Sequence, residues 1–264
     1  MLQRHNGRKI HFDYIGPTDA PVVCMVHSLA TDSGMWADQI GPLLQGGYRV
    51  LRVDLRGHGG SDAVIGAYTM YDLADDVVVT LDYLGIEMVT LIGLSIGGMI
   101  GQAFADRYEH RLDSLVLCDT QSASFPDAAA LWGPREKTVR AAASLAPIAE
   151  GMVDRWLSPG FRSAHPLRGK LVHDTIVATN IEGWAGCAAA IQNFDFTGTL
   201  PKLGKPTLVL YGSDDPATPP EENQRIASLV PDAKCVAIKG ALHLPNIERA
   251  KEFNHALMAF LGSR

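Results

Sequence analysis

The first 120 residues alternate between short apolar runs and longer amphipathic segments. Runs suited to strands occupy residues 8–15, 21–26, 48–54, 89–92 and 114–118. Between them, Leu73, Val77, Leu81 and Leu84 recur at helical spacing within residues 70–84, and further helices are expected from about Met35 and after Ser95. Strands that alternate with helices in this way form a parallel sheet with helices on both faces. The pattern therefore predicts an α/β fold.

The alternation stops after Asp119, and residues 121–193 have helical patterns without a strand-like run. Helical spacing is seen at Leu145, Ile148, Met152 and Trp156, then at Leu167, Leu171 and Ile176, and then within residues 182–194. Strand patterns return at 207–211 and 234–238, with helices expected at 221–229 and 248–261. Because sheet patterns resume, we expect a helical lid above the sheet rather than a separate helical domain. This divides the chain into a core of residues 1–120 and 195–264 and a lid of residues 121–194.

Composition narrows the class of protein. The chain has 264 residues, 47% of them hydrophobic and 20% charged, which suits one large α/β domain or two small ones. A net charge of −6 without a basic cluster argues against a nucleic-acid partner, and no apolar run reaches membrane-spanning length. The four cysteines are scattered, and no ligand spacing suggests a metal site. We therefore expect a cytoplasmic monomer or small homo-oligomer that acts on a small molecule, needs no metal or cofactor and binds no membrane.

The segment Gly93-Leu94-Ser95-Ile96-Gly97 places a serine where an apolar strand turns directly into a helix. The two glycines remove Cβ atoms that would clash in so tight a turn. The turn would project the Ser95 hydroxyl from the sheet edge and aim the backbone amide of Ile96 at an oxyanion. For the motif alone, a glycine-rich turn with an incidental serine is the alternative interpretation.

A serine nucleophile needs a base, and the base needs a third group to orient it. Two later loops supply candidates in the order serine, aspartate, histidine. His243 follows the last expected strand and is the candidate base. The acid is Asp214 or Asp215. We favour Asp215, which is third after Gly212, and expect Asp214 to brace the loop.

The loop after the expected strand at 21–26 should supply the second oxyanion donor, and the backbone amide of Leu29 is our choice. His27 and His58 are interpreted as residues that shape their loops through hydrogen bonds rather than as catalytic bases. From the residues alone, the chain is predicted to be a serine-dependent acyl hydrolase.

Six segments point to a particular family. They are residues 27–36, 93–99, 215–220 and 240–248, and the lid segments 155–166 and 182–195. In these segments the chain resembles the α/β-hydrolase superfamily and, within it, the 3-oxoadipate enol-lactonases. The lid segments are the most telling, since lids vary most in this superfamily. The enol-lactonases typically read Asn-Ser-Leu-Gly where this chain has His27-Ser28-Leu29-Ala30, a departure beside the oxyanion hole that bears on the substrate.

The resemblance implies an α/β-hydrolase fold: a mostly parallel sheet flanked by helices, with an inserted helical lid. It also implies hydrolysis of 3-oxoadipate enol-lactone, in aromatic-acid breakdown, through a Ser-His-Asp triad and an acyl-enzyme. A carboxylesterase or cofactor-free perhydrolase acting on another small ester is the alternative among enzymes. A small-molecule receptor on the same fold is the alternative from another class.

An anionic lactone would need a cation in the lid, because an unpaired carboxylate is costly to bury. The lid offers Arg135, Lys137, Arg140, Arg155, Arg162, Arg168 and Lys170. We choose Arg135 and Arg140, which follow closely after Trp132, as the substrate-binding candidates together with that tryptophan.

Overall fold

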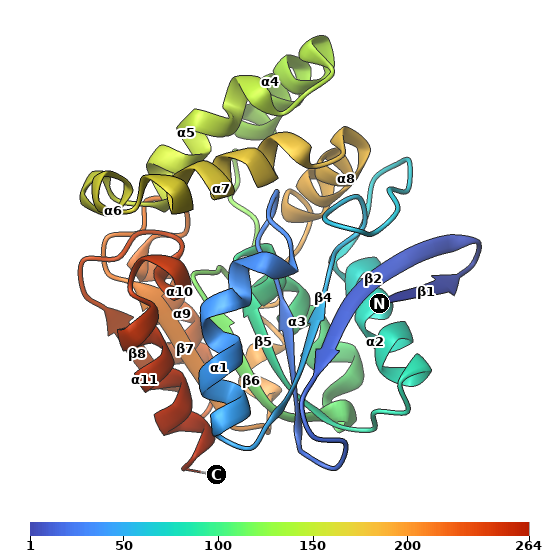
Figure 1. The fold of residues 1–264 in the computed structure, drawn as a ribbon, viewed down its shortest axis with the longest axis vertical. Helices are drawn as coiled ribbons and strands as arrows, with labels where there is room; N and C mark the ends of the chain where they lie inside the picture. The colour runs from blue at the N-terminus through green and yellow to red at the C-terminus, as the bar shows by residue number, and fades with distance from the viewer. Residues whose placement is uncertain (264) are drawn as a thin grey trace.

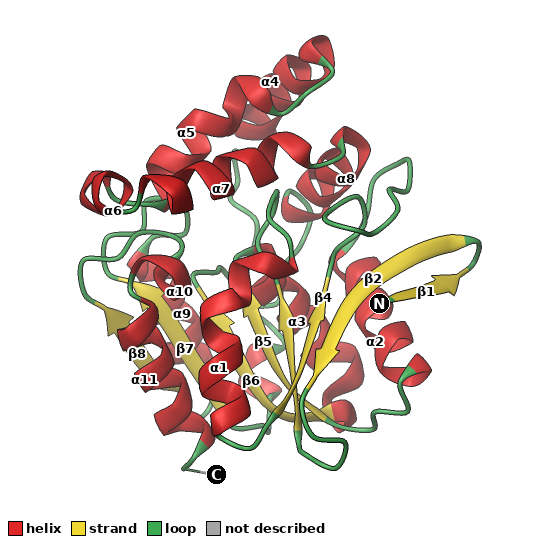
Figure 2. Cartoon of the chain, in the orientation of Figure 1, coloured by secondary structure: helices red, strands yellow, loops and turns green. Residues whose placement is uncertain are grey.

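In the computed structural model, which describes residues 1–263, eight strands form one sheet (Figures 1 and 2). Their spatial order is β1 (Leu2–His5), β2 (Arg8–Ile15), β4 (Arg49–Val53), β3 (Val22–Val26), β5 (Val89–Leu94), β6 (Leu112–Cys118), β7 (Thr207–Gly212) and β8 (Lys234–Ile238). β2 pairs antiparallel with both β1 and β4, and the pairings from β4 through β8 are parallel. The predicted α/β organisation is confirmed.

Helices cover both faces of this sheet. α1 (Ala37–Gln45) and α11 (Ala250–Leu261) pack together on one face, the nearer one in Figure 1. α2 (Met70–Tyr83) and α3 (Ile96–Tyr108) pack together on the other face, and α9 (Pro220–Leu229) contacts β7 and β8. Short 3₁₀ turns lie at Ser33–Trp36, Glu109–Arg111 and Leu200–Lys202. No helix within residues 1–263 combines the length and apolar character needed to cross a membrane.

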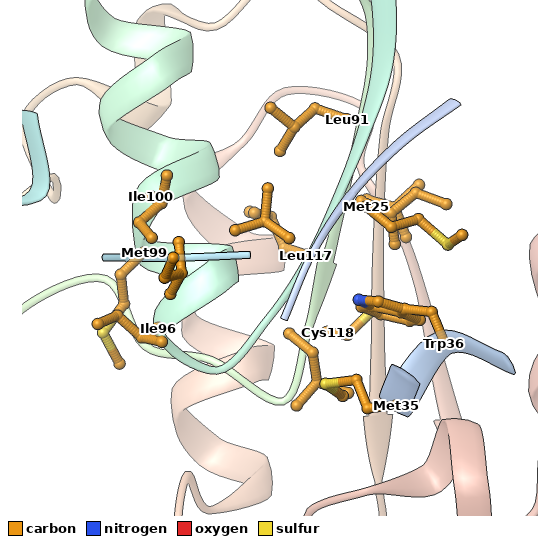
Figure 3. Close-up of a cluster of buried hydrophobic side chains, with 14 of the residues drawn as sticks. Met25, Met35, Trp36, Leu91, Ile96, Met99, Ile100, Leu117 and Cys118 are labelled. Atoms are coloured by element: carbon orange, nitrogen blue, oxygen red, sulfur yellow. The ribbon is translucent and has the colours of Figure 1, made fainter. Parts of the chain in front are cut away.

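β5 lies near the middle of the sheet, and all six of its residues, Val89–Leu94, are buried. A strand covered on both faces reads as a continuous apolar run, which explains the pattern in the sequence. Figure 3 shows Ile100 of α3 beside Leu117 of β6, with Trp36 near Met25 of β3 farther along the same core. The core therefore fixes the strand that leads into Ser95.

Five helices separate β6 from β7 in the described chain. They are α4 (Ala128–Ala142), α5 (Ala146–Trp156), α6 (Pro159–Ala164), α7 (Pro166–Ala178) and α8 (Ile181–Ile191), and Figure 2 shows them above the carboxyl ends of the parallel strands. The two ends of this insertion meet, because Ala123 and Asp195 form an isolated antiparallel bridge. The Ser124 amide donates to the Phe194 carbonyl at 2.9 Å beside it. The chain thus leaves and re-enters the core at one point.

Three elements depart from the sequence patterns. The patterns do not predict β1, which joins β2 through Asn6 and Gly7, whose φ values are 48° and 81°. Asn-Gly in this backbone conformation is the usual signal for a two-residue hairpin. The short helix α6 is also additional. The helix expected over 248–261 is α11, which begins at Ala250, and a short helix α10 (Pro245–Glu248) precedes it, ending at buried Glu248, which accepts the backbone amide of Leu242.

Candidate active site

Ser95 occupies the turn between β5 and α3. Its backbone has φ 57° and ψ −118°, which is strained for a residue with a Cβ atom. A Cβ on Gly93 would lie 2.0 Å from the carbonyl oxygen of Gly97, and one on Gly97 would lie 2.2 Å from that of Val26. Both glycines are therefore required by the turn. The serine itself lines a cavity beneath the helical insertion.

His243 and Asp215 form a buried hydrogen-bonded pair beside the same cavity. The Nδ1 of His243 lies 2.8 Å from Oδ2 of Asp215, and Asp215 also accepts the Ala217 amide at 2.7 Å and the Thr218 hydroxyl at 2.7 Å. Burial alone would raise the pKa of Asp215, but the charge of His243 and these hydrogen bonds lower it below its usual value. The carboxylate is thereby held ionised, and its partner Nδ1 carries the proton.

Asp214, the alternative acid, points elsewhere. Its side chain is exposed and accepts the hydroxyl of Ser213 at 2.6 Å, while its backbone amide donates to the Ala241 carbonyl. Only Asp215 of these two neighbours contacts His243. Of the two aspartates that the sequence offers as the acid partner of His243, the geometry favours Asp215.

The loop after β3 is held in place by two buried histidines. The backbone amide of Leu55 donates to Nε2 of His27 at 2.9 Å, and that of Ala30 donates to Nε2 of His58 at 3.0 Å. Because each Nε2 accepts a hydrogen bond, each ring is neutral with its proton on Nδ1. Burial lowers the pKa of both rings, to about 3 in the case of His58. The interpretation of both histidines as loop-shaping residues is confirmed.

Leu29 lies at the centre of this loop, and it lines the cavity opposite the Ser95 turn. Ala30, directly after it, has a φ of 56°, a conformation that glycine adopts more readily. Ile96 opens α3, so its backbone amide belongs to the first turn of that helix, where amides lack helical partners. The two amides expected to form an oxyanion hole thus come from loops on neighbouring strands, β3 and β5.

The cavity has a volume of about 400 Å³ and a mainly apolar wall. Trp132 lines it and packs against Trp184 with ring centroids 5.8 Å apart, and Trp156 lies 5.9 Å from the ring of His243. The inserted helices α4, α5 and α8 therefore place aromatic side chains over this part of the cavity. A volume of this size suits a small molecule that is largely enclosed.

Two arginines of the insertion face this apolar space. Arg135 and Arg155 both line the cavity, and within residues 1–263 neither forms an ion pair with a carboxylate. Burial, and then the nearby charge of Arg155, lower the pKa of Arg135. Its guanidinium lies 5.4 Å from the ring of Trp132, and Arg155 donates to the Pro216 carbonyl at 3.3 Å. The site thus holds positive charge that no protein anion neutralises.

Arg140 does not line this cavity, so that part of the sequence-based expectation is corrected. It is exposed and forms ion pairs of 2.8 Å with both Glu136 and Glu182. Residues five apart on a helix are rotated by about 140°, so Arg135 and Arg140 cannot share a face of α4. Trp132 and Arg135 are three apart and do share one.

The sequence reasoning did not single out Asp119, which lies beside the Asp215–His243 pair. Within residues 1–263, Asp119, Asp215 and His243 form a group whose potential ligand atoms lie within 4.8 Å of one another. Asp215 already accepts protein donors at both oxygens, so the pair is engaged without a metal. The signal available in the sequence was the position of Asp119 directly after β6, at the sheet edge where Ser95 also lies.

Comparisons with known proteins agree with this geometry. A family model described as alpha/beta hydrolase fold matches residues 21–250. 3-Oxoadipate enol-lactonase 2 of Acinetobacter baylyi is 33% identical over 253 residues, which cover 96% of this chain and 92% of that protein.

Two solved structures are also similar. The enol-lactonase from Burkholderia xenovorans LB400 has a TM-score of 0.94 and 32% identity, covering 99% of this chain and 100% of that one. A malate-bound thermophilic esterase from Thermogutta terrifontis has a TM-score of 0.91 and 32% identity, covering 99% of this chain and 96% of that one. The chain therefore belongs to the α/β-hydrolase family, and it is an enzyme that hydrolyses ester or lactone bonds.

Proposed function

We propose that the enzyme hydrolyses a small anionic enol-lactone, 3-oxoadipate enol-lactone being the best candidate, with Ser95, His243 and Asp215 as its triad. One observation carries the proposal. A strained serine and a histidine that is hydrogen-bonded to a buried aspartate line the same small cavity as two arginines without carboxylate partners. The first set suits acyl transfer and the second suits a substrate with a negative charge.

In the proposed mechanism, His243 takes the proton of the Ser95 hydroxyl as its oxygen attacks the lactone carbonyl carbon. The backbone amides of Leu29 and Ile96 stabilise the oxyanion that forms. Collapse of this intermediate breaks the ring C–O bond, and His243 returns the proton to the enol oxygen. In a lactone the leaving enol oxygen and the acyl carbon belong to the same molecule. Ring opening therefore releases no separate alcohol, and the whole substrate remains attached to Ser95 as the acyl-enzyme.

A water molecule then attacks the acyl-enzyme, with His243 again as the base. Cleavage of the Ser95 ester releases a carboxylic acid, while the enol tautomerises to a ketone. The product is a 3-oxo dicarboxylate. Asp215 remains ionised through both steps and stabilises the imidazolium that forms twice in the cycle.

Arg135 and Arg155 are proposed to hold the substrate's own carboxylate. Both arginines are half-buried, and a bound carboxylate could accept two parallel hydrogen bonds from a guanidinium. The lowered pKa of Arg135 shows that its positive charge is not stabilised by the protein, and a bound anion would stabilise it. The similar thermophilic esterase is described as malate bound, and malate is a dicarboxylate. Residues 121–194 would act as the lid that excludes water around this contact.

The second candidate is a carboxylesterase that acts on a small neutral ester, or a perhydrolase acting on such an ester. The mainly apolar cavity wall and the similarity to an esterase favour it. Membership of a family of hydrolases makes a receptor without turnover the weaker alternative.

A steady-state comparison tests the proposal. The specificity constant kcat/KM is measured for 3-oxoadipate enol-lactone, for the corresponding lactone whose carboxylate is methylated, and for a short-chain neutral ester. We expect the anionic lactone to exceed its methylated form by about tenfold or more, the effect of one charge-assisted contact. If the methylated lactone and the neutral ester are used equally well or better, the carboxylesterase alternative replaces the proposal.

A further inference from the structure

Asp119 is a buried aspartate that the mechanism above does not use. It is the first residue after β6, its side chain is fully buried, and its φ is 41°. Its Oδ1 accepts the backbone amide of Gly212 at 2.8 Å, and its own amide donates to the Leu210 carbonyl at 3.2 Å. These bonds attach Asp119 to β7, the strand that leads into Asp215.

The second oxygen of Asp119 has no protein donor. Oδ2 is buried, and within residues 1–263 no N–H or O–H group points at it. One carboxylate oxygen of Asp119 and one of Asp215 nevertheless lie within 4.8 Å of each other. Two carboxyl groups can share a hydrogen bond only when one of them carries a proton. Two buried carboxylates at this separation would repel each other if both were ionised, so the arrangement favours one proton on the pair.

The surroundings decide which aspartate carries it. The titratable groups facing Asp119 are Asp215, His243 and Cys118, the neighbouring thiol at the end of β6. No lysine or arginine of the described chain forms an ion pair with Asp119, and two adjacent buried carboxylates cannot both ionise. Burial, and then the charge of Asp215, raise the pKa of Asp119 well above its usual range. Asp215 has the donors that stabilise its anion, so the proton belongs to Asp119.

We propose that Asp119 is a protonated positioning residue, which donates a hydrogen bond from its carboxyl group to the Asp215 carboxylate and so holds that carboxylate in line with His243. The proposal rests on the proposed function, because it assigns Asp119 a role through the triad. Asp119 does not contact the substrate cavity. In this role it fixes the orientation of the Asp215 carboxylate and draws negative charge toward itself.

This role makes a specific demand on the side chain. A neutral donor and a neutral acceptor are both needed, the donor for Asp215 and the acceptor for the Gly212 amide. Asparagine supplies both with the same shape, and it tolerates a left-handed backbone. Alanine supplies neither, and without the donor the charge on Asp215 is more concentrated, which would make His243 more basic.

The first experiment compares pH profiles of kcat/KM with a chromogenic short-chain ester. For Asp119→Asn we expect activity within about threefold of the wild type and an unshifted acid limb, because the neutral hydrogen bond survives. For Asp119→Ala we expect kcat to fall by about 10-fold to 100-fold with KM nearly unchanged, and the acid limb to move to higher pH. If Asp119→Asn instead moves the acid limb to lower pH by about half a unit or more, Asp119 is an anion and the proposal is overturned.

The second experiment reads the proton directly and needs no turnover. The infrared difference spectrum at neutral pH between the wild type and Asp119→Asn should contain the carbonyl band of a protonated carboxylic acid. Exposed Asp19→Asn is the matched control and should show a carboxylate band. A carboxylate band for Asp119 would overturn the proposal even if Asp119→Asn were active. Failure of the proposed function would appear separately, as unchanged ester and lactone hydrolysis in Ser95→Ala.

Discussion

Replacing His58 by glutamine should remove a large part of the acid sensitivity of the fold. The neutral ring accepts the Ala30 amide through Nε2 and donates to the Arg56 carbonyl through Nδ1 at 2.9 Å. A proton on Nε2 would oppose the Ala30 N–H, and the ring is fully buried. Protonation is therefore incompatible with the native loop that carries Leu29. Glutamine can accept the same amide but does not titrate.

The magnitude follows from two pKa values. The pKa of His58 is about 3 in the fold, against 6.5 for an ordinary histidine, mainly because of burial. Below about pH 6.5 the unfolded chain binds this proton and the folded chain does not. The stability that the neutral ring contributes is thus complete above the unfolded pKa and is lost as the pH falls toward 3. Between about pH 7 and about pH 5, the loss from this one group is about 2 kcal/mol.

Urea unfolding at these two pH values, followed by tryptophan fluorescence, measures the effect. The wild type should lose about 2 kcal/mol more of its free energy of unfolding than His58→Gln between the two conditions. Replacing exposed His255 by glutamine is the matched control and should leave the difference unchanged. Equal losses in the wild type and in His58→Gln would refute the reasoning, because the acid sensitivity would then come from other groups.

Three further predictions concern catalysis. Ser95→Ala should lower kcat by several powers of ten without unfolding the protein, as checked by circular dichroism, and near-full activity would exclude Ser95 as the nucleophile. Asp215→Asn should lower kcat by about 10⁴-fold, and Asp214→Asn far less, because only the first group holds the imidazole; the reverse order would contradict the pairing seen here. Arg135→Ala should lower the ratio of kcat/KM for the anionic lactone to kcat/KM for the neutral ester, by a factor that corresponds to about 2 kcal/mol of transition-state stabilisation. Arg140→Ala is the exposed control. Equal effects of the two arginine variants on that ratio would show that Arg135 does not sense substrate charge.

The parts of the site that could be predicted depend on local geometry. A strand, a tight turn and a helix are specified within 93–97, and a Cβ on Gly93 is excluded by the nearby backbone of Gly97; only the contact that excludes a Cβ on Gly97 comes from a distant residue, Val26. Loops that follow parallel strands reach the same sheet edge, so the approach of Asp215 and His243 to one another follows from strand order. The Asn6-Gly7 hairpin is equally local, but β1 before it has only four residues, Leu2–His5, with a single apolar side chain, so its sequence shows no strand pattern.

The remaining features depend on contacts between distant segments. Whether an arginine of α4 faces the cavity or solvent is set by how the helix is rotated against α5 and α8, and composition does not fix that rotation. The proximity of Asp119 to Asp215 requires β6 and β7 to be neighbours in a particular register. Buried Glu248, at the end of α10, accepts the Ser158 amide, which lies 90 positions away in the sequence. Contacts between residues so far apart in the sequence cannot be predicted from the local sequence around either residue.

The bridge between Ala123 and Asp195 has a consequence for how such enzymes diversify. Because the two ends of the insertion pair with each other, the core can hold the same two chain ends in place for insertions of different length. Closing a longer or shorter loop on that anchor changes the chain entropy only slowly, by about 0.6 kcal/mol for each doubling of length. The helices above the cavity can therefore be exchanged as one module while the nucleophile turn below keeps its shape. We therefore expect that an insertion from a related enzyme, joined at residues 123 and 195, would change the cavity wall that it supplies and leave the Ser95 turn in place.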